Sequence, residues 1–213
     1  MITRRHTVQL GAAVLSGWAV GQVVRRTVPI GEEVGDPEAA RAILRGHGAP
    51  ASGPRDASVR LAVFTDYRCP ACRRAYPALA EAVHEDGDVR LIYKEWPLFG
   101  PASRQAARVA LAADDQGIYP AVHRRLMTVG RTFDETVLRD AVVAAGGDWT
   151  RLTSALATDG GDIEARLHAN ARDAFAAGLP GTPAYLTGSF KVVGALDADE
   201  FGRLFKRVRA ATR

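Results

Sequence analysis

The two cysteines of this 213-residue chain, Cys69 and Cys72, lie between an apolar run and a helix-like segment. The run VRLAVFT at 59–65 has the composition of a buried β-strand, and the segment after Cys69 opens on Pro70, which suits a first helical position. A second strand-like run, VRLIYKEW, follows at 89–96. Strand, helix and strand in this order favour parallel pairing of the two strands. The cysteine pair is therefore predicted at the strand-to-helix junction of a β-α-β unit.

Pro77 predicts a kink or a local break within the helix that starts at Pro70. Beyond it, from 101 to 178, apolar residues recur at helical spacing and hardly any strand signal is found. Asp134 and Asp148 are expected to cap two of these helices. The segment 162–178 predicts another, whose apolar stripe consists of Ile163, Leu167, Ala171, Ala174 and Phe175.

The C-terminal part of the chain, after the helical block, again contains strand-like segments. PAYLT and FKVVG flank Gly188-Ser189, a connection typical of a type II′ hairpin. Asp197 and Glu200 have the spacing of a capping box, which predicts a closing helix. The architecture is thus an α/β fold in which two halves of one sheet are separated by a helical block. Its predicted parts are an export segment at 1–26, a short helix and linker at 27–58, an α/β domain formed by 59–100 and 179–213, and a helical insertion at 101–178.

The charge distribution argues against a general binding face for nucleic acid. The chain has a net charge of +4, with 28 basic and 24 acidic residues, but residues 1–26 hold four arginines and no acid. The remaining basic and acidic residues balance, so no polyanion-binding surface is indicated. Hydrophobic residues make up 47% of the chain and charged residues 24%, a composition that predicts a folded core.

The N-terminus has the pattern of an export signal. Arg4 and Arg5 precede an uncharged stretch at 7–24, and Ala19-Val20-Gly21 offers a small-x-small cleavage site. TRRHTVQL is also similar to a twin-arginine signal, with Thr7 where that pattern prefers an aromatic residue. The uncharged stretch is just long enough to remain as a membrane anchor. In either case the body is expected outside the cytoplasm, in the periplasm or an equivalent compartment, where disulfides persist.

The spacing of the cysteines allows three interpretations. A structural staple is a weak one, because bridging residues this close removes little entropy from the unfolded chain. A zinc site usually needs four ligands, and no second cysteine pair is present. The histidines are scattered, with a surface or capping role expected for each: His6, His47, His84, His123 and His168.

A redox pair fits the local physics best. At the start of a helix, free backbone N–H groups and the helix dipole stabilise a thiolate at Cys69. Arg68, Arg73 and Arg74 add positive charge within a turn. These features predict a lowered pKa for Cys69, expected to be the more exposed sulfur, with Cys72 as its partner one turn into the helix. A stabilised thiolate stabilises the reduced form and makes the disulfide oxidising.

Three blocks, VFTDYRCPACRRAYPAL, YKEWPLFGPASRQAARVALAA and GLPGTPAYLTGSFKVVGALDADEF, together resemble the DsbA-like thiol–disulfide oxidoreductases. The resemblance runs from about Pro37 to Phe205 and implies a thioredoxin-like fold with an inserted helical domain. It also implies that Pro183 is the cis-proline facing the cysteines. Thr182, the residue before it, would then offer its backbone to a bound peptide. An ordinary turn proline at the start of a strand is the alternative for Pro183.

Several positions depart from the family pattern. The residues between the cysteines, Pro70 and Ala71, lack the aromatic or histidine side chain that many relatives carry second, so the redox potential cannot be transferred. Val63 stands where relatives often place a glutamate that moves protons at the inner sulfur. Proton transfer would then fall to Asp66, to Glu95 or to water. Glu95 belongs to the YKEWP block typical of the family and could equally be a carboxylate at an element edge.

The resemblance implies an exported dithiol oxidase that accepts a substrate thiolate at Cys69 and is resolved by Cys72. Its substrates would be unfolded or partly folded exported proteins, and a membrane quinone-linked partner would reoxidise it. No organic cofactor and no metal are expected. A disulfide isomerase or reductase of the same fold is the first alternative, and a thiol or metal chaperone that binds without redox chemistry is the second.

Overall fold

The computed structural model describes residues 29–130 and 132–212. The chain divides into two compact units, 1–30 and 31–213, and the described strands and helices all belong to the second unit. The predicted export segment and its alternative as an anchor at 7–24 lie outside the described residues. Within the two described ranges, no helix combines the length and the hydropathy that crossing a membrane requires.

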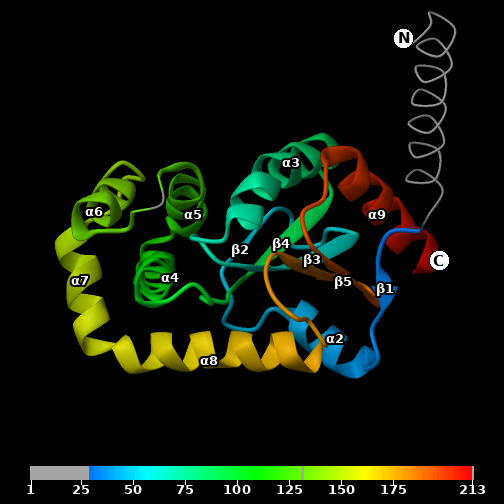
Figure 1. Ribbon diagram of the computed structural model, residues 1–213, viewed down its shortest axis with the longest axis horizontal. Coiled ribbons are helices and arrows are strands. Elements are labelled where there is room, and N and C mark those ends of the chain that lie inside the picture. Colours follow the sequence, from blue (N-terminus) through cyan, green and yellow to red (C-terminus); the bar gives the residue numbers. More distant parts are fainter. Residues whose placement is uncertain (1–28, 131, 213) are drawn as a thin grey trace, which may run out of the picture. The chain divides into compact units, whose positions relative to one another are not determined.

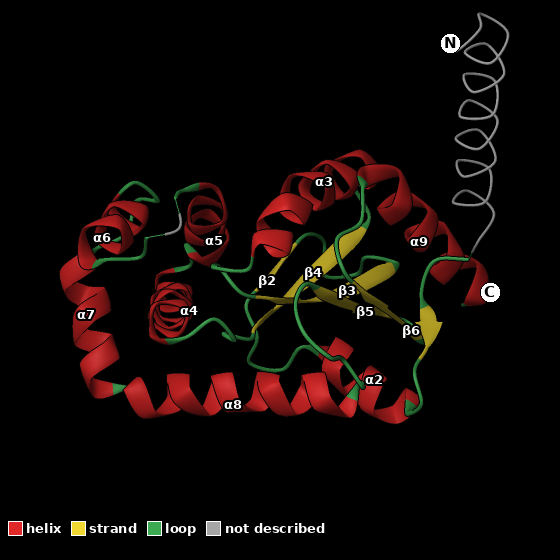
Figure 2. Ribbon diagram, in the orientation of Figure 1, coloured by secondary structure: helices red, strands yellow, loops and turns green. Residues whose placement is uncertain are grey.

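One mixed sheet forms the centre of the described unit, with strand order β1-β6-β5-β3-β4-β2 (Figure 2). The strands are β1 (Glu32–Glu33), β2 (Ala51–Ser52), β3 (Val59–Thr65), β4 (Val89–Glu95), β5 (Ala184–Thr187) and β6 (Phe190–Val193). β3 and β4 pair in parallel, as the order of elements predicts, and the other pairings are antiparallel. Because β3 also pairs with β5, the two halves of the chain share one sheet, as expected.

Helices cover both faces of this sheet (Figure 1). They are α2 (Pro37–Arg45), α3 (Pro70–Asp86), α4 (Pro101–Ala113), α5 (Tyr119–Thr128), α6 (Glu135–Val143), α7 (Trp149–Thr158), α8 (Gly160–Ala176) and α9 (Ala198–Ala211), with a 3₁₀ turn at Asp114–Gln116. α3 and α9 lie on one face, and α2 and the end of α8 lie on the other (Figure 1). Helices α4 to α7 form a block beside the sheet, and α8 leads back to it.

The apolar residues of β3 are divided between the two faces by the period of two of a strand. Ala62 and Phe64 join the core cluster under α2 and the end of α8. Val63 lies opposite Tyr185 of β5, whose ring meets Phe201 of α9 edge-on with ring centroids 5.0 Å apart. Burial on both sides explains why the residues from Leu61 to Phe64 are all apolar, without the alternation of a half-exposed strand.

Local turn and capping signals are confirmed. Gly188 has a φ of +55° and no non-glycine residue of the described chain has positive φ, which is the type II′ combination. Asp197 and Glu200 form the predicted capping box at the start of α9. The side chains of Asp134 and Asp148 accept backbone N–H groups at the starts of α6 and α7.

Three sequence expectations are wrong or incomplete. α3 continues through Pro77, so the local break expected as an alternative to a kink is absent. Phe175 is 70% exposed, because at 100° per residue it lies at the edge of the stripe whose buried members are Ile163, Leu167 and Ala174, although its ring meets Trp96 edge-on. The segment 27–58, predicted as a helix and linker, also supplies both edge strands. β1 and β2 are too short to show an alternating pattern in the sequence.

Candidate active site

Cys69 occupies the position just before α3, where the chain leaves the carboxyl end of β3. Its backbone is extended, with φ of −68° and ψ of 116°, and Pro70 begins the helix. The backbone N–H of Cys72 donates a hydrogen bond to the Cys69 sulfur, with N and Sγ 3.4 Å apart. The sulfur thus takes the place of the oxygen that commonly caps a helix. Both cysteines are present as free thiols.

The second partner of Cys69 comes from a distant part of the chain. Its thiol donates to the carbonyl oxygen of Thr182 at 3.3 Å. The peptide bond between Thr182 and Pro183 is cis, and Pro183 leads directly into β5. Since β5 pairs with β3, the sheet itself brings this carbonyl to the start of α3. The predicted substrate-contact residues therefore lie against the predicted reactive sulfur.

The two thiols have pKa values shifted in opposite directions. The pKa of Cys69 is lowered from 9.0 to about 6, chiefly by its hydrogen bond with the Cys72 thiol, against the opposing effect of burial. Backbone contacts with Cys72 and Ala71 and the side chain of Thr182 lower it further. The pKa of Cys72 is raised well above its ordinary value by the same thiol–thiol hydrogen bond and by burial. Cys69 is therefore the sulfur that ionises, and Cys72 holds its proton.

The predicted causes of the difference between the thiols need correction in part. Both cysteines are almost fully covered, at 2% for Cys69 and 3% for Cys72, so exposure does not separate the two residues. The arginines are also absent from the main causes of the lowered Cys69 pKa. Arg68 donates to the carbonyl of Phe99 at 2.9 Å, and Arg73 donates to that of Leu126 at 2.9 Å. These guanidinium groups hold backbone in place, while the helix start stabilises the thiolate.

Asp66 holds a loop and has no free oxygen to offer a sulfur. Its carboxylate accepts the backbone N–H of Arg68 at 2.7 Å, those of Leu98 and Phe99 at 2.5 and 3.0 Å, and the hydroxyl of Ser103. These four bonds engage both oxygens. Asp66, a predicted candidate for proton transfer, therefore fixes the loop after β4 against the loop that precedes Cys69.

Glu95 lies at the end of β4 and is fully buried, with no exposed surface. Its Oε1 accepts hydrogen bonds from the hydroxyls of Tyr67 and Tyr119, each at 2.5 Å. The Nδ1 of His123 lies 2.9 Å from the Tyr67 hydroxyl and 3.6 Å from Glu95 Oε1. We call Glu95, Tyr67, Tyr119 and His123 the Glu95 cluster. It joins the sheet, the loop before Cys69 and helix α5 beside the cysteines.

His123 corrects the expectation that every histidine serves a surface or capping role, since it is 3% exposed and faces the Glu95 cluster. Tyr67, Tyr119 and Thr65 were not singled out from the sequence either. Thr65 ends β3 opposite Glu95, and its side chain partly offsets the rise in the Cys72 pKa. Only the position of Tyr67, two residues before Cys69, could have drawn attention to it.

The remaining predicted residues line the same junction. Val63 is buried between Tyr93 of β4 and Tyr185 of β5, so its side chain offers no proton to Cys72. Pro70 and Ala71 form the first turn of α3, where Ala71 acts on Cys69 through its backbone. The part of the chain that the structure describes contains no cluster of three or more metal-ligating side chains.

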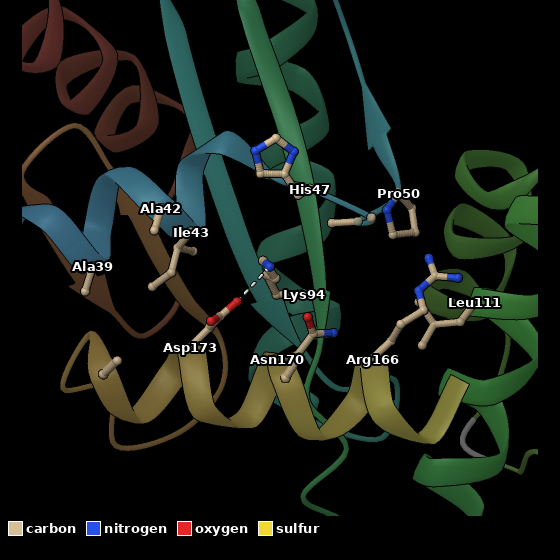
Figure 3. A pocket seen from close by; sticks show the side chains of 14 residues that line it. Ala39, Ala42, Ile43, His47, Pro50, Lys94, Leu111, Arg166, Asn170 and Asp173 are labelled. Atoms are coloured by element: carbon tan, nitrogen blue, oxygen red, sulfur yellow. Dashed lines mark hydrogen bonds and ion pairs between the residues drawn. The ribbon is translucent and has the colours of Figure 1, made fainter. Parts of the chain in front are cut away.

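A separate cavity of about 370 Å³ lies between α2, α8 and β4 (Figure 3). Lys94 points into it and forms an ion pair with Asp173, with Nζ and Oδ2 2.8 Å apart. Arg166 at its other side is paired with Asp114. Lys94 and Glu95 are neighbours on a strand, so their side chains lie on opposite faces of the sheet. This cavity is therefore distinct from the face that holds the thiols.

Comparison with known proteins identifies relatives of most of the described unit. A family model for the DSBA-like thioredoxin domain matches residues 60–206. A thioredoxin-like oxidoreductase from Silicibacter pomeroyi is 32% identical, covers 76% of this chain and 93% of its own, and superposes with a TM-score of 0.72. A periplasmic thioredoxin-like protein from Salmonella enterica serovar Typhimurium is 26% identical, with coverage of 81% and 97% and a TM-score of 0.70.

Similarity also extends to parts of larger proteins. The Na⁺/H⁺ antiporter NhaA 1 of Salinispora arenicola is 35% identical over 77 residues, which are 35% of this chain and 12% of the antiporter. The chain thus spans a small fraction of the length of this curated relative. Together with the family match, the shared sheet and the inserted helices confirm the predicted fold, a thioredoxin-like domain with a helical insertion.

Proposed function

The chain belongs to the family of DSBA-like thioredoxin domains and is a thiol–disulfide oxidoreductase, and from this premise we propose that it is an exported oxidase that introduces disulfides into extracytoplasmic proteins. The observation that carries the proposal is the unequal pair of thiols at the start of α3. A lowered pKa at Cys69 favours the reduced form, since the thiolate is stabilised only after the disulfide opens. A pair that gains stability on reduction readily takes electrons from substrate thiols.

The reaction proceeds in two exchanges. A substrate thiolate attacks the Cys69 sulfur of the oxidised pair, forming a mixed disulfide while the Cys69–Cys72 bond breaks and Cys72 leaves and is protonated. A second substrate thiolate then attacks the substrate sulfur of the mixed disulfide. The substrate disulfide forms, and Cys69 leaves as a thiolate. The substrate loses two electrons, and the cysteine pair gains them.

Substrate binding is assigned to the backbone around Thr182 and Pro183 and to the apolar surface beside it. Leu98 and Phe99 are 47% and 45% exposed, and Asp66 and Arg68 hold their backbone close to the active-site loop. Exposed apolar side chains of this size are suited to unfolded chains, which expose apolar residues of their own. Folded proteins, whose cysteines are covered, would be poor substrates.

Export and reoxidation complete the proposal. The basic lead and uncharged stretch at 7–24 would direct the protein out of the cytoplasm, either as a cleaved signal or as an anchor. A relative of known structure is described as periplasmic, which supports this placement. Because each cycle leaves the pair reduced, a membrane quinone-linked protein is proposed to reoxidise it.

The redox equilibrium of the full chain with glutathione tests the proposal. An oxidase is expected to have a potential close to about −120 mV, the value of DsbA, and to oxidise a reduced, unfolded protein faster than glutathione disulfide does. A potential close to about −270 mV, that of thioredoxin, would refute the oxidase and favour an isomerase or reductase. If replacing both cysteines with serine left the activity unchanged, redox chemistry would itself be excluded, and the cysteines would have a core role only.

A further inference from the structure

The cavity beside Lys94 is enclosed by two helices that carry small residues where they border it (Figure 3). α2 contributes Ala39 and Ala42 to its wall, and α8 contributes Ala169 and Ala176. Their methyl groups are too short to fill the space between the helices and the sheet, although protein interiors are normally packed without large voids. A volume of about 370 Å³ remains, which is within the range of small-molecule sites.

Lys94 is a buried cation whose hydrogen-bond donors are only partly used. The residue is 6% exposed, and its ammonium group has three N–H bonds. Oδ2 of Asp173 accepts one of them at 2.8 Å, and residues 29–130 and 132–212 offer Nζ no other acceptor. A buried donor without an acceptor costs free energy. Because Lys94 points into the cavity, its remaining donors suit an acceptor that enters there (Figure 3).

The charged side chains of the cavity wall favour an anion. Among the described residues that line the cavity, Lys94 and Arg166 are cations and Asp173 is the one acid, which leaves an excess of one positive charge. Arg166 and Asp173 are seven positions apart on α8, about two turns, so both lie on the same side of the helix. The guanidinium of Arg166 pairs with Asp114 at 3.2 Å but has five donors in all. An anionic group between Lys94 and Arg166 would therefore find donors from both.

The rest of the wall is largely apolar and determines what the anion must carry. Ile43 of α2, Pro50 of the loop before β2 and Leu111 of α4 border the same space (Figure 3). An inorganic anion would leave these side chains in contact with water, whereas a neutral apolar molecule would leave the Lys94 ammonium without a further acceptor. A ligand that satisfies both parts of the wall has one acidic group and a short apolar body.

We propose that this cavity binds a small organic acid, whose carboxylate contacts Lys94 and Arg166 and whose apolar body lies against Ile43 and Leu111. Binding is non-covalent and leaves the ion pair between Lys94 and Asp173 in place. The proposal goes beyond the proposed function and does not depend on it, because the cavity and the thiols lie on opposite faces of the sheet. Since the wall comes from α2, α8 and β4, the bound acid also joins α8, the last helix of the insertion, to the sheet.

Calorimetric titration of the full chain with hexanoate tests the site. We expect a dissociation constant of about 1 mM or lower, and acetate should bind at least roughly tenfold more weakly because it lacks four of the methylene groups that the apolar wall would cover. Hexylammonium has a similar body and the opposite charge, so it should give no measurable binding.

Two variants that break the same ion pair separate ligand contact from stability. Lys94→Met keeps an unbranched side chain and loses the charge, so hexanoate should bind at least roughly tenfold more weakly. Asp173→Asn also loses the ion pair but removes the carboxylate that competes for Lys94, so hexanoate should bind at least as tightly as to the wild type. Arg172→Met changes the net charge as Lys94→Met does, at an exposed position of α8 outside the cavity wall, and should leave binding unchanged.

Ala169→Leu tests the cavity itself and keeps every charge. Its larger side chain should fill the space beside Lys94 and abolish hexanoate binding, while leucine remains a good helix former. The proposal is overturned if hexanoate binds no more tightly than acetate, or if the wild type shows no binding at 10 times the expected dissociation constant, about 10 mM. Equal weakening in Lys94→Met and Arg172→Met, or in Lys94→Met and Asp173→Asn, would overturn it as well.

Discussion

The sulfur of Cys69 and the carboxylate of Glu95 are both buried groups that can carry charge, but they are held in different ways. The thiolate of Cys69 is stabilised mainly by groups within one turn of α3, and in the thiol form the sulfur donates to the Thr182 carbonyl. Glu95 is stabilised by side chains from a loop and from α5. The first site depends on a helix start that the chain forms locally, and the second exists only after the helical insertion has docked.

The largest effect is expected when the sulfur at the start of α3 is removed. Cys69→Ser should abolish disulfide exchange with substrate, because the hydroxyl cannot form the mixed disulfide and no other thiol approaches Thr182. The rate of oxidation of a reduced, unfolded protein measures this. Cys72→Ser is the matched control: its Cys69 thiolate should attack the disulfide of an oxidised peptide, release one peptide thiolate and accumulate a stable mixed disulfide, visible by mass spectrometry. Exchange that persists in Cys69→Ser would mean that Cys72 alone can react.

The charge state of the local site should follow pH strongly. With a Cys69 pKa of about 6, the ultraviolet absorbance of the thiolate should rise about tenfold between about pH 5 and about pH 7 in the reduced protein. The lowered pKa also makes the reduced form more stable as pH rises from about 6 toward the unfolded value of 9.0, and this gain is lost as pH falls through about 6. Oxidised protein should show no such rise, and a midpoint near 9 would contradict the assignment.

A moderate loss of stability is expected when a hydrogen bond of the Glu95 cluster is removed. Tyr119→Phe removes one of the two phenol donors to Glu95 and leaves Tyr67 in place, so unfolding should require about 1–3 kcal/mol less free energy. Chemical denaturation at constant pH measures this. Tyr93→Phe, which instead loses a hydroxyl contact with Ser52 at the sheet edge, is a comparison variant with an expected smaller loss. Equal losses would indicate that the Glu95 hydrogen bonds contribute no more than an edge contact.

The smallest expected effect concerns the arginines. Arg68→Ala removes the bond to the Phe99 carbonyl but none of the main causes of the lowered Cys69 pKa. The midpoint of the thiolate absorbance should therefore stay at about 6. Stability should change by about 0.5 kcal/mol or less, as for an ordinary surface position. A clear rise of the midpoint would restore the arginines as the source of thiolate stabilisation.

Much of the fold followed from local patterns. The parallel pair of β3 and β4, the helical insertion, the turn at Gly188 and the cap at Asp197 each depend on residues close together in the sequence. The edge strands β1 and β2 were not predicted, because pairs of residues in a strand carry no period. The exposure of Phe175 was not predicted either, since the apolar stripe does not show how far the covering elements reach around α8.

By itself, the sequence determined the reactive pair: a strand, two cysteines and a helix starting at Pro70 place the Cys69 sulfur among free backbone N–H groups wherever this segment folds. Tertiary structure decided what surrounds that pair. It alone brought the Thr182 carbonyl to Cys69 across 113 positions, covered both sulfurs, and assembled Glu95 with Tyr67, Tyr119 and His123. The physical reason is how far apart in the sequence the interacting groups lie. Backbone hydrogen bonds at a helix start form between near neighbours, whereas a buried side-chain cluster requires elements that meet only in the packed fold.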